Sequence, residues 1–191
     1  DMIHWEAHGT VLKPDAFDYA VPTSAWAAQV VRADDGKYYF YVTLDDKNTK
    51  LHTVDVAVSD SPLGPVLPAR KDGTPLVTDD MTPDSHRWNA DIDPTVLIDD
   101  DGTPWIAWGN GDCYMARLKK NMYEIDGEVK KVPLRNYSEG PWLMKRNDIY
   151  YIIYAADAPG VQEEQMAYST APSINGPWTY GGFISTSANH G

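Results

Sequence analysis

One β-hairpin pattern occurs three times along this chain, and this repetition limits the possible folds more than any other feature of the sequence. Each copy consists of an apolar strand, a short polar turn and a second strand rich in aromatic or β-branched residues. The copies lie at 30–41, 96–107 and 143–153. The aligned residues Tyr39, Trp105 and Tyr151 are 66 and 46 residues apart, so the pattern returns after a complete multi-strand unit.

A further strand with nearly the same ending follows two of these hairpins, at 57–65 and 167–177. An all-β unit of three to four strands at this spacing is typical of a β-propeller blade. A plain β-sandwich is the alternative, but it would not require the repeated strand ending. No segment has a sustained 3.6-residue apolar period, so we expect few and short helices. The sequence therefore favours an all-β propeller.

The chain starts and stops out of phase with this repeat. Residues 2–12 are interpreted as the last strand of a blade, residues 178–187 as the equivalent strand of a later blade, and residues 187–191 as the start of another. We therefore expect residues 1–191 to form part of a single propeller domain, with about three complete blades and two partial ones. Its partners would then include the remaining segments of the same propeller.

Composition restricts the classes of ligand. The formal net charge is −12 and the pI about 4.6, which argues against nucleic acid or an anionic membrane as partner. The aromatic residues are mostly Tyr and Trp, whose apolar faces and polar edges suit sugar binding as well as cores. The single cysteine, Cys113, excludes an internal disulfide and is expected to be buried. His52 and His86 are isolated in the sequence, and we interpret both as surface or loop residues.

Three residues are expected to face the central channel of such a propeller, where the inner strands converge. Asp93 stands just before an apolar strand, and Pro94 after it predicts an extended backbone at Asp93. We interpret Trp26 and Glu139 as lying at the equivalent position of the preceding and the following blade. Carboxylates gathered in a poorly solvated site have their pKa values pushed apart, so that one remains a proton donor near neutral pH. Glycoside hydrolysis needs such a pair.

Three motifs resemble those of glycoside hydrolase family 43. They are Ile-Asp-Pro-Thr-Val-Leu-Ile-Asp-Asp-Asp-Gly at 92–102, Glu-Gly-Pro-Trp-Leu-Met-Lys-Arg at 139–146 and Asn-His-Gly at 189–191. Residues 26–30 resemble the family's Trp-Ala-Pro segment, with Ala28 in place of the usual proline. The resemblance covers essentially the whole chain. It implies a five-bladed propeller that cleaves β-D-xylosidic and α-L-arabinofuranosidic bonds with inversion, here without the start of the first blade and without the fifth blade.

The resemblance also implies a role for each candidate residue. Glu139 would be the general acid, Asp93 would tune the pKa of the acid and orient it, and Trp26 would contact the sugar. His190 would hold a calcium ion near the channel axis, directly or through water, and no organic cofactor is implied. The family's general base is an Asp in the first inner strand, which no residue of this chain matches. We therefore expect the isolated chain to be inactive.

The expected substrates are xylan, arabinoxylan and arabinan, or oligosaccharides from these plant cell-wall polysaccharides. The sequence does not decide whether xylose or arabinofuranose is the sugar whose bond is cleaved, or whether the action is exo or endo. The related fructan-cleaving propellers carry Arg-Asp-Pro and Glu-Cys-Pro where this chain has Ile-Asp-Pro and Glu-Gly-Pro, which disfavours them. A non-catalytic sugar-binding propeller is a further alternative, against which the intact Asp93 and Glu139 argue. Because the chain begins with Asp1 rather than methionine, we expect a removed leader or a missing N-terminal part. We expect a secreted or periplasmic protein, with a cytoplasmic location left open.

Overall fold

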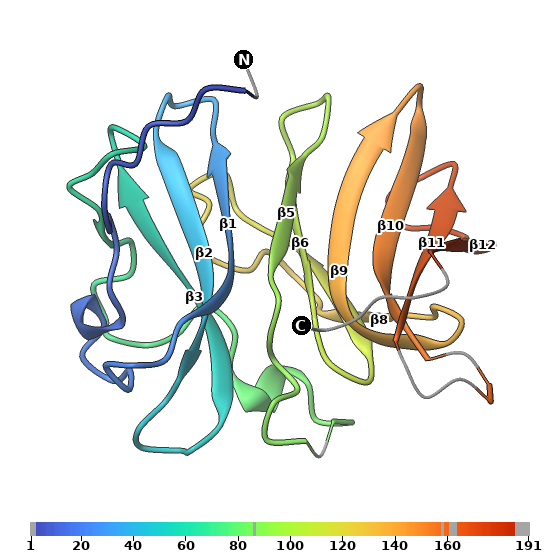
Figure 1. Cartoon of the computed structure of the whole chain (residues 1–191), viewed down its shortest axis with the longest axis horizontal. Coiled ribbons are helices and arrows are strands. Elements are labelled where there is room, and N and C mark those ends of the chain that lie inside the picture. Colours follow the sequence, from blue (N-terminus) through green and yellow to red (C-terminus); the bar gives the residue numbers. More distant parts are fainter. Residues whose placement is uncertain (1–2, 86, 158, 161–163, 186–191) are drawn as a thin grey trace.

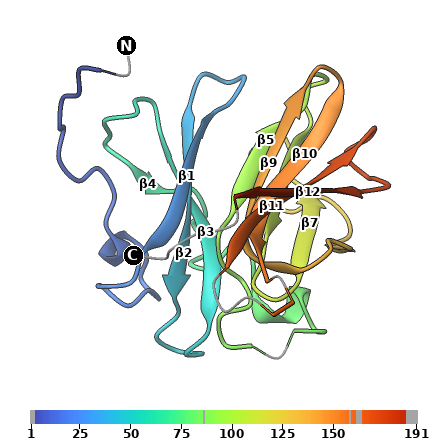
Figure 2. The same cartoon turned by 45° about the vertical axis from the view of Figure 1, so that its right-hand side comes forward.

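The computed structural model, described here for residues 3–85, 87–157, 159–160 and 164–185, contains three antiparallel four-stranded sheets (Figures 1 and 2). Each sheet is a blade whose strands follow one another in chain order. The first blade consists of β1 (Trp26–Arg32), β2 (Tyr38–Asp45), β3 (His52–Ser59) and β4 (Leu67–Pro68). The second consists of β5 (Thr95–Ile98), β6 (Pro104–Trp108), β7 (Cys113–Arg117) and β8 (Lys130–Val132). The third consists of β9 (Tyr137–Arg146), β10 (Ile149–Ala156), β11 (Gln165–Ala171) and β12 (Thr179–Ser185).

The three complete blades expected from the sequence are therefore confirmed, as is the near absence of helix. The described residues contain only two short 3₁₀ turns, η1 (Pro14–Ala16) and η2 (Asp79–Met81). Neither is long and apolar enough to cross a membrane. Residues 178–187 were interpreted as the last strand of a blade, and most of them form β12 at the edge of the third sheet.

Neighbouring blades pack face to face, and their strands alternate side chains between two cores. In β6, Ile106 and Trp108 enter the core shared with the first blade, whereas Ala107 enters the core shared with the third. In β2, Tyr41 faces the second blade and Val42 faces the outer side of the first. The inner strand β5 stands between β1 and β9 and contacts both (Figure 1). The inner strands thus converge as a propeller requires.

The inner strands are also joined by a hydrogen bond that repeats from blade to blade. The side-chain oxygen of Gln29 in β1 accepts the backbone N–H of Val96 in β5. In the same way, Oγ1 of Thr95 in β5 accepts the backbone N–H of Leu143 in β9, at 3.2 Å. Gln29 and Thr95 each lie one position before the repeat residue that starts the hairpin pattern. This contact ties each inner strand to the next one.

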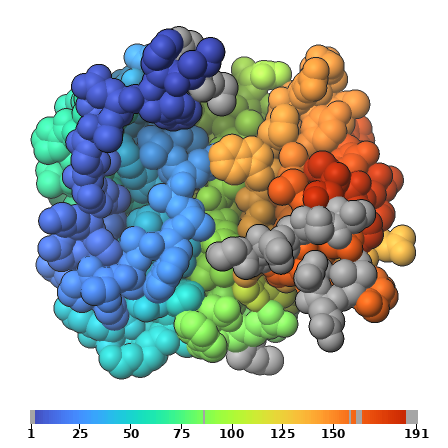
Figure 3. Space-filling view, viewed as in Figure 1, coloured from blue at the N-terminus to red at the C-terminus, as the bar shows by residue number. Residues whose placement is uncertain are grey.

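The strand expected at 2–12 is not present, because residues 3–12 form no strand in the structure. A strand needs a neighbour for its N–H and C=O groups, and this segment crosses the outer side of the first blade instead of joining its edge (Figures 1 and 3). Val11 and Leu12 pack there against the core that includes Phe17 and Phe40. Ile3 and Trp5 are exposed.

Pairing is short at the outer edge of the first two blades. The chain before β8 is a loop with one bridge, between Leu118 and Ile125. The edge strand β4 of the first blade has only two residues. Sequence patterns are correspondingly weak at such edges.

The contact between Thr95 and Leu143 can be tested by Thr95→Val, which keeps the side-chain shape but removes the acceptor. The buried N–H of Leu143 then loses its partner, and we expect the free energy of unfolding of the full-length protein to fall by about 1–3 kcal/mol. Chemical denaturation measures this. Thr179→Val, at an exposed position of β12, is the control and should change stability by less than about 0.5 kcal/mol. Equal losses in both variants would contradict a linking role for this hydrogen bond.

Candidate active site

Each inner strand is bent at its start by a residue in the left-handed backbone region. These residues are Ala27, Asp93 and Gly140, with φ of 47°, 58° and 60°. They occupy the same position of the repeat, three residues before the first residue of each hairpin pattern. The pairing of β1 with β2 and of β9 with β10 is irregular at this point, as expected for a β-bulge. The bulge bends these two inner strands where they begin.

The expectation of an extended Asp93 is therefore wrong. Proline disfavours the right-handed helical region for the residue before it, but Asp93 adopts the left-handed region, which Asp tolerates better than most residues. The backbone N–H of Asp93 donates to Oγ1 of Thr43 in β2 of the first blade, at 2.9 Å. This contact between blades, together with the bulge, outweighs the local preference set by Pro94.

The structure brings Asp93 close to the residue that follows Glu139, but Asp93 and Glu139 do not occupy equivalent positions of the repeat. Glu139 aligns with Ile92 and Trp26, because each lies four residues before the start of its hairpin pattern. Asp93 aligns with Gly140. A Cβ atom added to Gly140 would lie 3.8 Å from Oδ2 of Asp93, so this carboxylate lies against the residue that follows Glu139. The two carboxylates thus reach the same region from neighbouring blades with a one-residue offset.

The phenol of Tyr137 lies close enough to both carboxylates for them to raise its pKa. Burial raises the pKa of its phenol well above the ordinary value, and the nearby Cys113, Asp93 and Glu139 raise it further. Its hydroxyl donates to the carbonyl oxygen of Gly109 at 2.6 Å. Tyr137 is therefore a neutral hydrogen-bond donor that fixes the loop after β6 beside the carboxylates.

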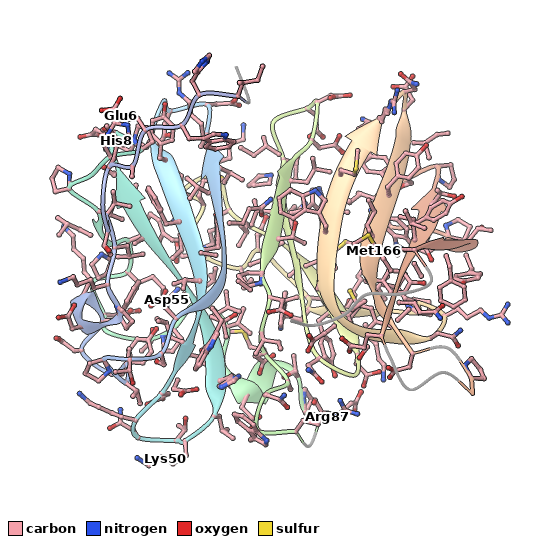
Figure 4. All side chains as sticks on the ribbon, in the orientation of Figure 1. Glu6, His8, Lys50, Asp55, Arg87 and Met166 are labelled. Atoms are coloured by element: carbon pink, nitrogen blue, oxygen red, sulfur yellow. The ribbon has the colours of Figure 1, made fainter. Side chains whose placement is uncertain are left out.

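Two side chains that the sequence interpretation missed complete this contact network. Asn110 donates from Nδ2 to Oε2 of Glu139 at 2.7 Å, and Arg87 donates from Nη1 to Oδ1 of Asn110 at 2.6 Å. Arg87 lies at the lower end of the second blade in Figure 4. A Gly-Asn-Gly loop directly after a strand could have indicated Asn110, but nothing in the sequence connects Arg87 to Asn110.

Trp26 belongs to an aromatic cluster with His52 and Trp88. The His52 ring centroid lies 5.1 Å from that of Trp26 and 4.6 Å from that of Trp88. The two indoles are 46% and 59% exposed, whereas the His52 side chain is largely covered and its Nε2 lies 2.6 Å from Oδ1 of Asp45. Burial lowers the pKa of His52, against the opposite effect of Asp45. His52 is therefore not the isolated loop residue expected, while His86 lies outside the described residues.

Asp91, two residues before Asp93, anchors the start of β5 from below the surface. Its carboxylate accepts the indole N–H of Trp108 at 2.8 Å and the hydroxyl of Thr82 at 3.1 Å. Asp91 is 1% exposed, and burial raises its pKa from 3.8 to about 6, with these two donors acting in the opposite direction. This buried carboxylate connects β6 and the loop around η2 to the backbone that carries Asp93.

The expected calcium site is not tested by this geometry. Among the described residues, no group of three or more His, Cys, Asp or Glu side chains is arranged to hold a metal ion. His190, the expected ligand, lies outside the described residues. The described part of the site thus offers two carboxylates, an amide and a guanidinium, with two exposed indoles in the first two blades.

The protein-family model described as "Glycosyl hydrolases family 43" matches residues 1–190 of this chain. A beta-D-galactofuranosidase, xynD, of Aspergillus niger is 28% identical over 94% of this chain, and a xylosidase/arabinosidase of Bacteroides ovatus is 29% identical over 94%. Among solved structures, an alpha-L-arabinofuranosidase of Clostridium thermocellum has a TM-score of 0.83 at 26% identity over 97% of this chain. The chain spans 53%, 62% and 59% of the lengths of these three proteins.

The raised pKa of Asp91 predicts an unusual pH dependence of stability. Between pH 3.8 and about 6 the folded state binds more protons at Asp91 than the unfolded state does. The stability contributed by Asp91 is therefore complete at low pH and is lost as the pH rises through about 6. Asp91→Asn is uncharged throughout and keeps an oxygen for Trp108. The free energy of unfolding of Asp91→Asn, taken relative to that of the wild type, should rise by on the order of 3 kcal/mol between about pH 4 and about pH 7.

Denaturant titrations at several pH values measure this difference. Asp148→Asn, in the exposed turn between β9 and β10, is the control and should follow the wild type at every pH. If the difference in unfolding free energy between Asp91→Asn and the wild type does not change with pH, ionisation of Asp91 does not destabilise the folded protein.

Proposed function

This chain belongs to glycosyl hydrolase family 43, and from that premise we propose that it forms part of an inverting glycosidase acting on β-D-xylosidic or α-L-arabinofuranosidic bonds of plant cell-wall polysaccharides. Family membership supports this proposal, and the similar proteins include a xylosidase/arabinosidase and an endo-alpha-(1->5)-L-arabinanase. The observation that carries the finer proposal is the placement of Asp93 beside the residue that follows Glu139. In this arrangement Glu139 acts on the glycosidic oxygen, and Asp93 from the neighbouring blade acts on Glu139.

In this proposal, Glu139 is the general acid. It gives its proton to the leaving oxygen as the bond to the sugar ring breaks. Asp93 keeps negative charge close to Glu139, which favours the protonated acid, and it helps to orient that acid. We assign no residue of this chain as the base that activates water, which inverting hydrolysis requires about 6.5–9.5 Å from the acid.

The exposed indoles of Trp26 and Trp88 supply the proposed binding surface for sugar. A pyranose or furanose ring has apolar C–H faces that stack on an indole, and its hydroxyls remain available for hydrogen bonds. His52 fills the space between the two indoles, and its lowered pKa favours a neutral ring. An uncharged surface of this kind fits a neutral polysaccharide, and the acidic chain as a whole does not need a charged ligand.

Substrate class is proposed from the named relatives. They include xylosidase/arabinosidases of Bacteroides ovatus and Humicola insolens and endo-alpha-(1->5)-L-arabinanases of Bacillus subtilis. The two Bacillus subtilis arabinanases are named as extracellular, which supports our proposal that the full-length protein is secreted. We also retain calcium at the channel axis, with His190 as ligand, as a proposal. Removal of calcium from the full-length protein with a chelator, followed by activity and melting measurements, tests it.

The variant Glu139→Gln in the full-length protein tests whether Glu139 acts as the acid or has only a structural role. The amide cannot supply a proton, so we expect turnover of xylosides and arabinofuranosides with poor leaving groups to fall by about 10²- to 10⁴-fold. Aryl glycosides whose leaving groups need no proton should lose far less. Glu128→Gln, at an exposed glutamate, is the control and should be fully active. An equal loss on both kinds of substrate would exclude Glu139 as the acid, and sugar binding without hydrolysis in the wild type would favour a non-catalytic propeller.

Trp88→Ala tests the proposed sugar surface. Loss of one stacking face should raise KM for oligosaccharides by roughly 5- to 30-fold, corresponding to about 1–2 kcal/mol, with a smaller change in kcat. Steady-state kinetics on xylo- and arabino-oligosaccharides measure both constants. Trp5→Ala, which removes an exposed indole from the N-terminal segment, is the matched control. Unchanged KM for Trp88→Ala would place the substrate elsewhere.

A further inference from the structure

We infer that Asn110 is a positioning residue that acts through Glu139, and that Arg87 sets the direction in which the Asn110 amide points. This inference rests on the proposed function, because it assigns Glu139 the role of acid. It is carried by two consecutive hydrogen bonds, from Arg87 to Asn110 and from Asn110 to Glu139, which run from the loop before β5 across the loop after β6 to the start of β9.

The direction of the amide follows from the chemistry of its neighbours. A guanidinium can only donate hydrogen bonds, so Arg87 must contact the oxygen of the Asn110 amide rather than its nitrogen. Nη1 of Arg87 lies 2.6 Å from Oδ1 of Asn110, which leaves the NH₂ group to face Glu139. An amide held from only one side could rotate by half a turn and exchange its oxygen and nitrogen. Arg87 removes that freedom.

The position of Arg87 depends in turn on Gly111. A Cβ atom at residue 111 would lie 2.9 Å from Cζ of Arg87, closer than real Cβ contacts come. Gly111 also has a φ of 80°, which side chains rarely adopt. The glycine therefore leaves the space in which the guanidinium lies against the loop. A side chain at this position would push Arg87 away from the Asn110 amide.

The backbone of the loop is fixed to both blades that supply the carboxylates. The N–H of Gly109 donates to the carbonyl oxygen of Ile92, next to Asp93, at 2.8 Å. The N–H of Gly111 donates to the carbonyl oxygen of Ser138, next to Glu139, at 2.6 Å. Asn110 is thus held between the two blades at a fixed distance from each, and its side chain is 8% exposed. The position of the second blade therefore determines where Asn110 holds the side chain of Glu139 in the third blade.

This geometry has a specific chemical consequence. Because Nδ2 of Asn110 donates to Oε2 of Glu139, that oxygen is engaged as an acceptor, and the acid proton is directed to Oε1. The donated bond also favours the carboxylate form, as does the positive charge of Arg87 behind it. Asp93 acts in the opposite direction, Tyr137 stays neutral, and the carboxylate of Glu164 accepts a hydrogen bond from the hydroxyl of Ser138, the residue before Glu139. Removing the amide should therefore misplace the acid and keep it protonated to higher pH.

The test compares Asn110→Ala with Asn121→Ala in the full-length protein. Asn121 also donates from its amide to a glutamate, Glu124, but in the loop before β8, so its replacement removes the same kind of contact without touching the site. For Asn110→Ala we expect kcat on substrates with poor leaving groups to fall by about 10- to 100-fold, with KM within about threefold of the wild type. The basic limb of the pH profile of kcat/KM should move to higher pH. Arg87→Met should show a smaller change of the same kind, and Asn121→Ala none.

Equal losses on aryl substrates with good leaving groups, or an unmoved basic limb, would overturn the inference. A second measurement does not depend on activity and separates this inference from the proposed function. In protein with ¹³C-labelled glutamate carboxyls, the titration midpoint of Glu139 should rise in Asn110→Ala and stay unchanged in Asn121→Ala. If no glycoside is hydrolysed by the wild type, the proposed function fails, while this titration still decides whether Asn110 acts on Glu139. An unchanged midpoint would overturn the inference by itself.

Discussion

The burial of Trp108 between the first two blades connects the fold to the site. Its ring fills the core that β2, β3, β6 and β7 share, and its indole N–H is directed to Asp91. A large side chain buried between two sheets must satisfy its one polar group there, because an unpaired donor costs about 1–3 kcal/mol. Asp91 provides the acceptor, and Asp91 stands two residues before Asp93. The packing between the first two blades therefore also fixes the position of the backbone that carries Asp93.

The offset between Asp93 and Glu139 gives the two carboxylates different supports. Asp93 is the bent residue itself, and its own backbone N–H is tied to Thr43 of the first blade. Glu139 precedes the bend, which Gly140 takes, and its side chain is held by Asn110 of the second blade. Each carboxylate is thus held by the blade before its own. A site made in this way keeps its geometry only as long as the blades keep their mutual packing.

Much of the fold could be predicted from the sequence, because hairpins with apolar alternation and turn residues are local patterns. The strands around Tyr39, Trp105 and Tyr151 could be expected for this reason, and they are observed as β2, β6 and β10. Residues 3–12 look like a strand locally, but strand formation depends on a neighbour that a local pattern does not report. Weak pairing at the blade edges explains the missed β4 in the same way.

The candidate site was predictable only in part. Asp93 and Glu139 could be proposed because each stands beside a recognisable strand. Their one-residue offset places the left-handed backbone at Asp93 itself and at Gly140 after Glu139, which an expectation based on Pro94 does not capture. Asn110 was missed because its partner is 29 residues away in the sequence. His52 looked isolated because Trp26 and Trp88 approach it only after the first blade has folded.

The two glycines that flank Asn110 limit how this site could be redesigned. A Cβ atom at Gly109 would lie 2.1 Å from the carbonyl oxygen of Asp112, and one at Gly111 would collide with Arg87. Saturation libraries at Gly109 would therefore consist mostly of misfolded clones, and most substitutions at Gly111 would displace Arg87 from Asn110. The exposed surface around Trp88 tolerates substitution much better. For directed evolution of substrate preference, substitutions are best made on that surface, and the Gly-Asn-Gly loop is best left unchanged.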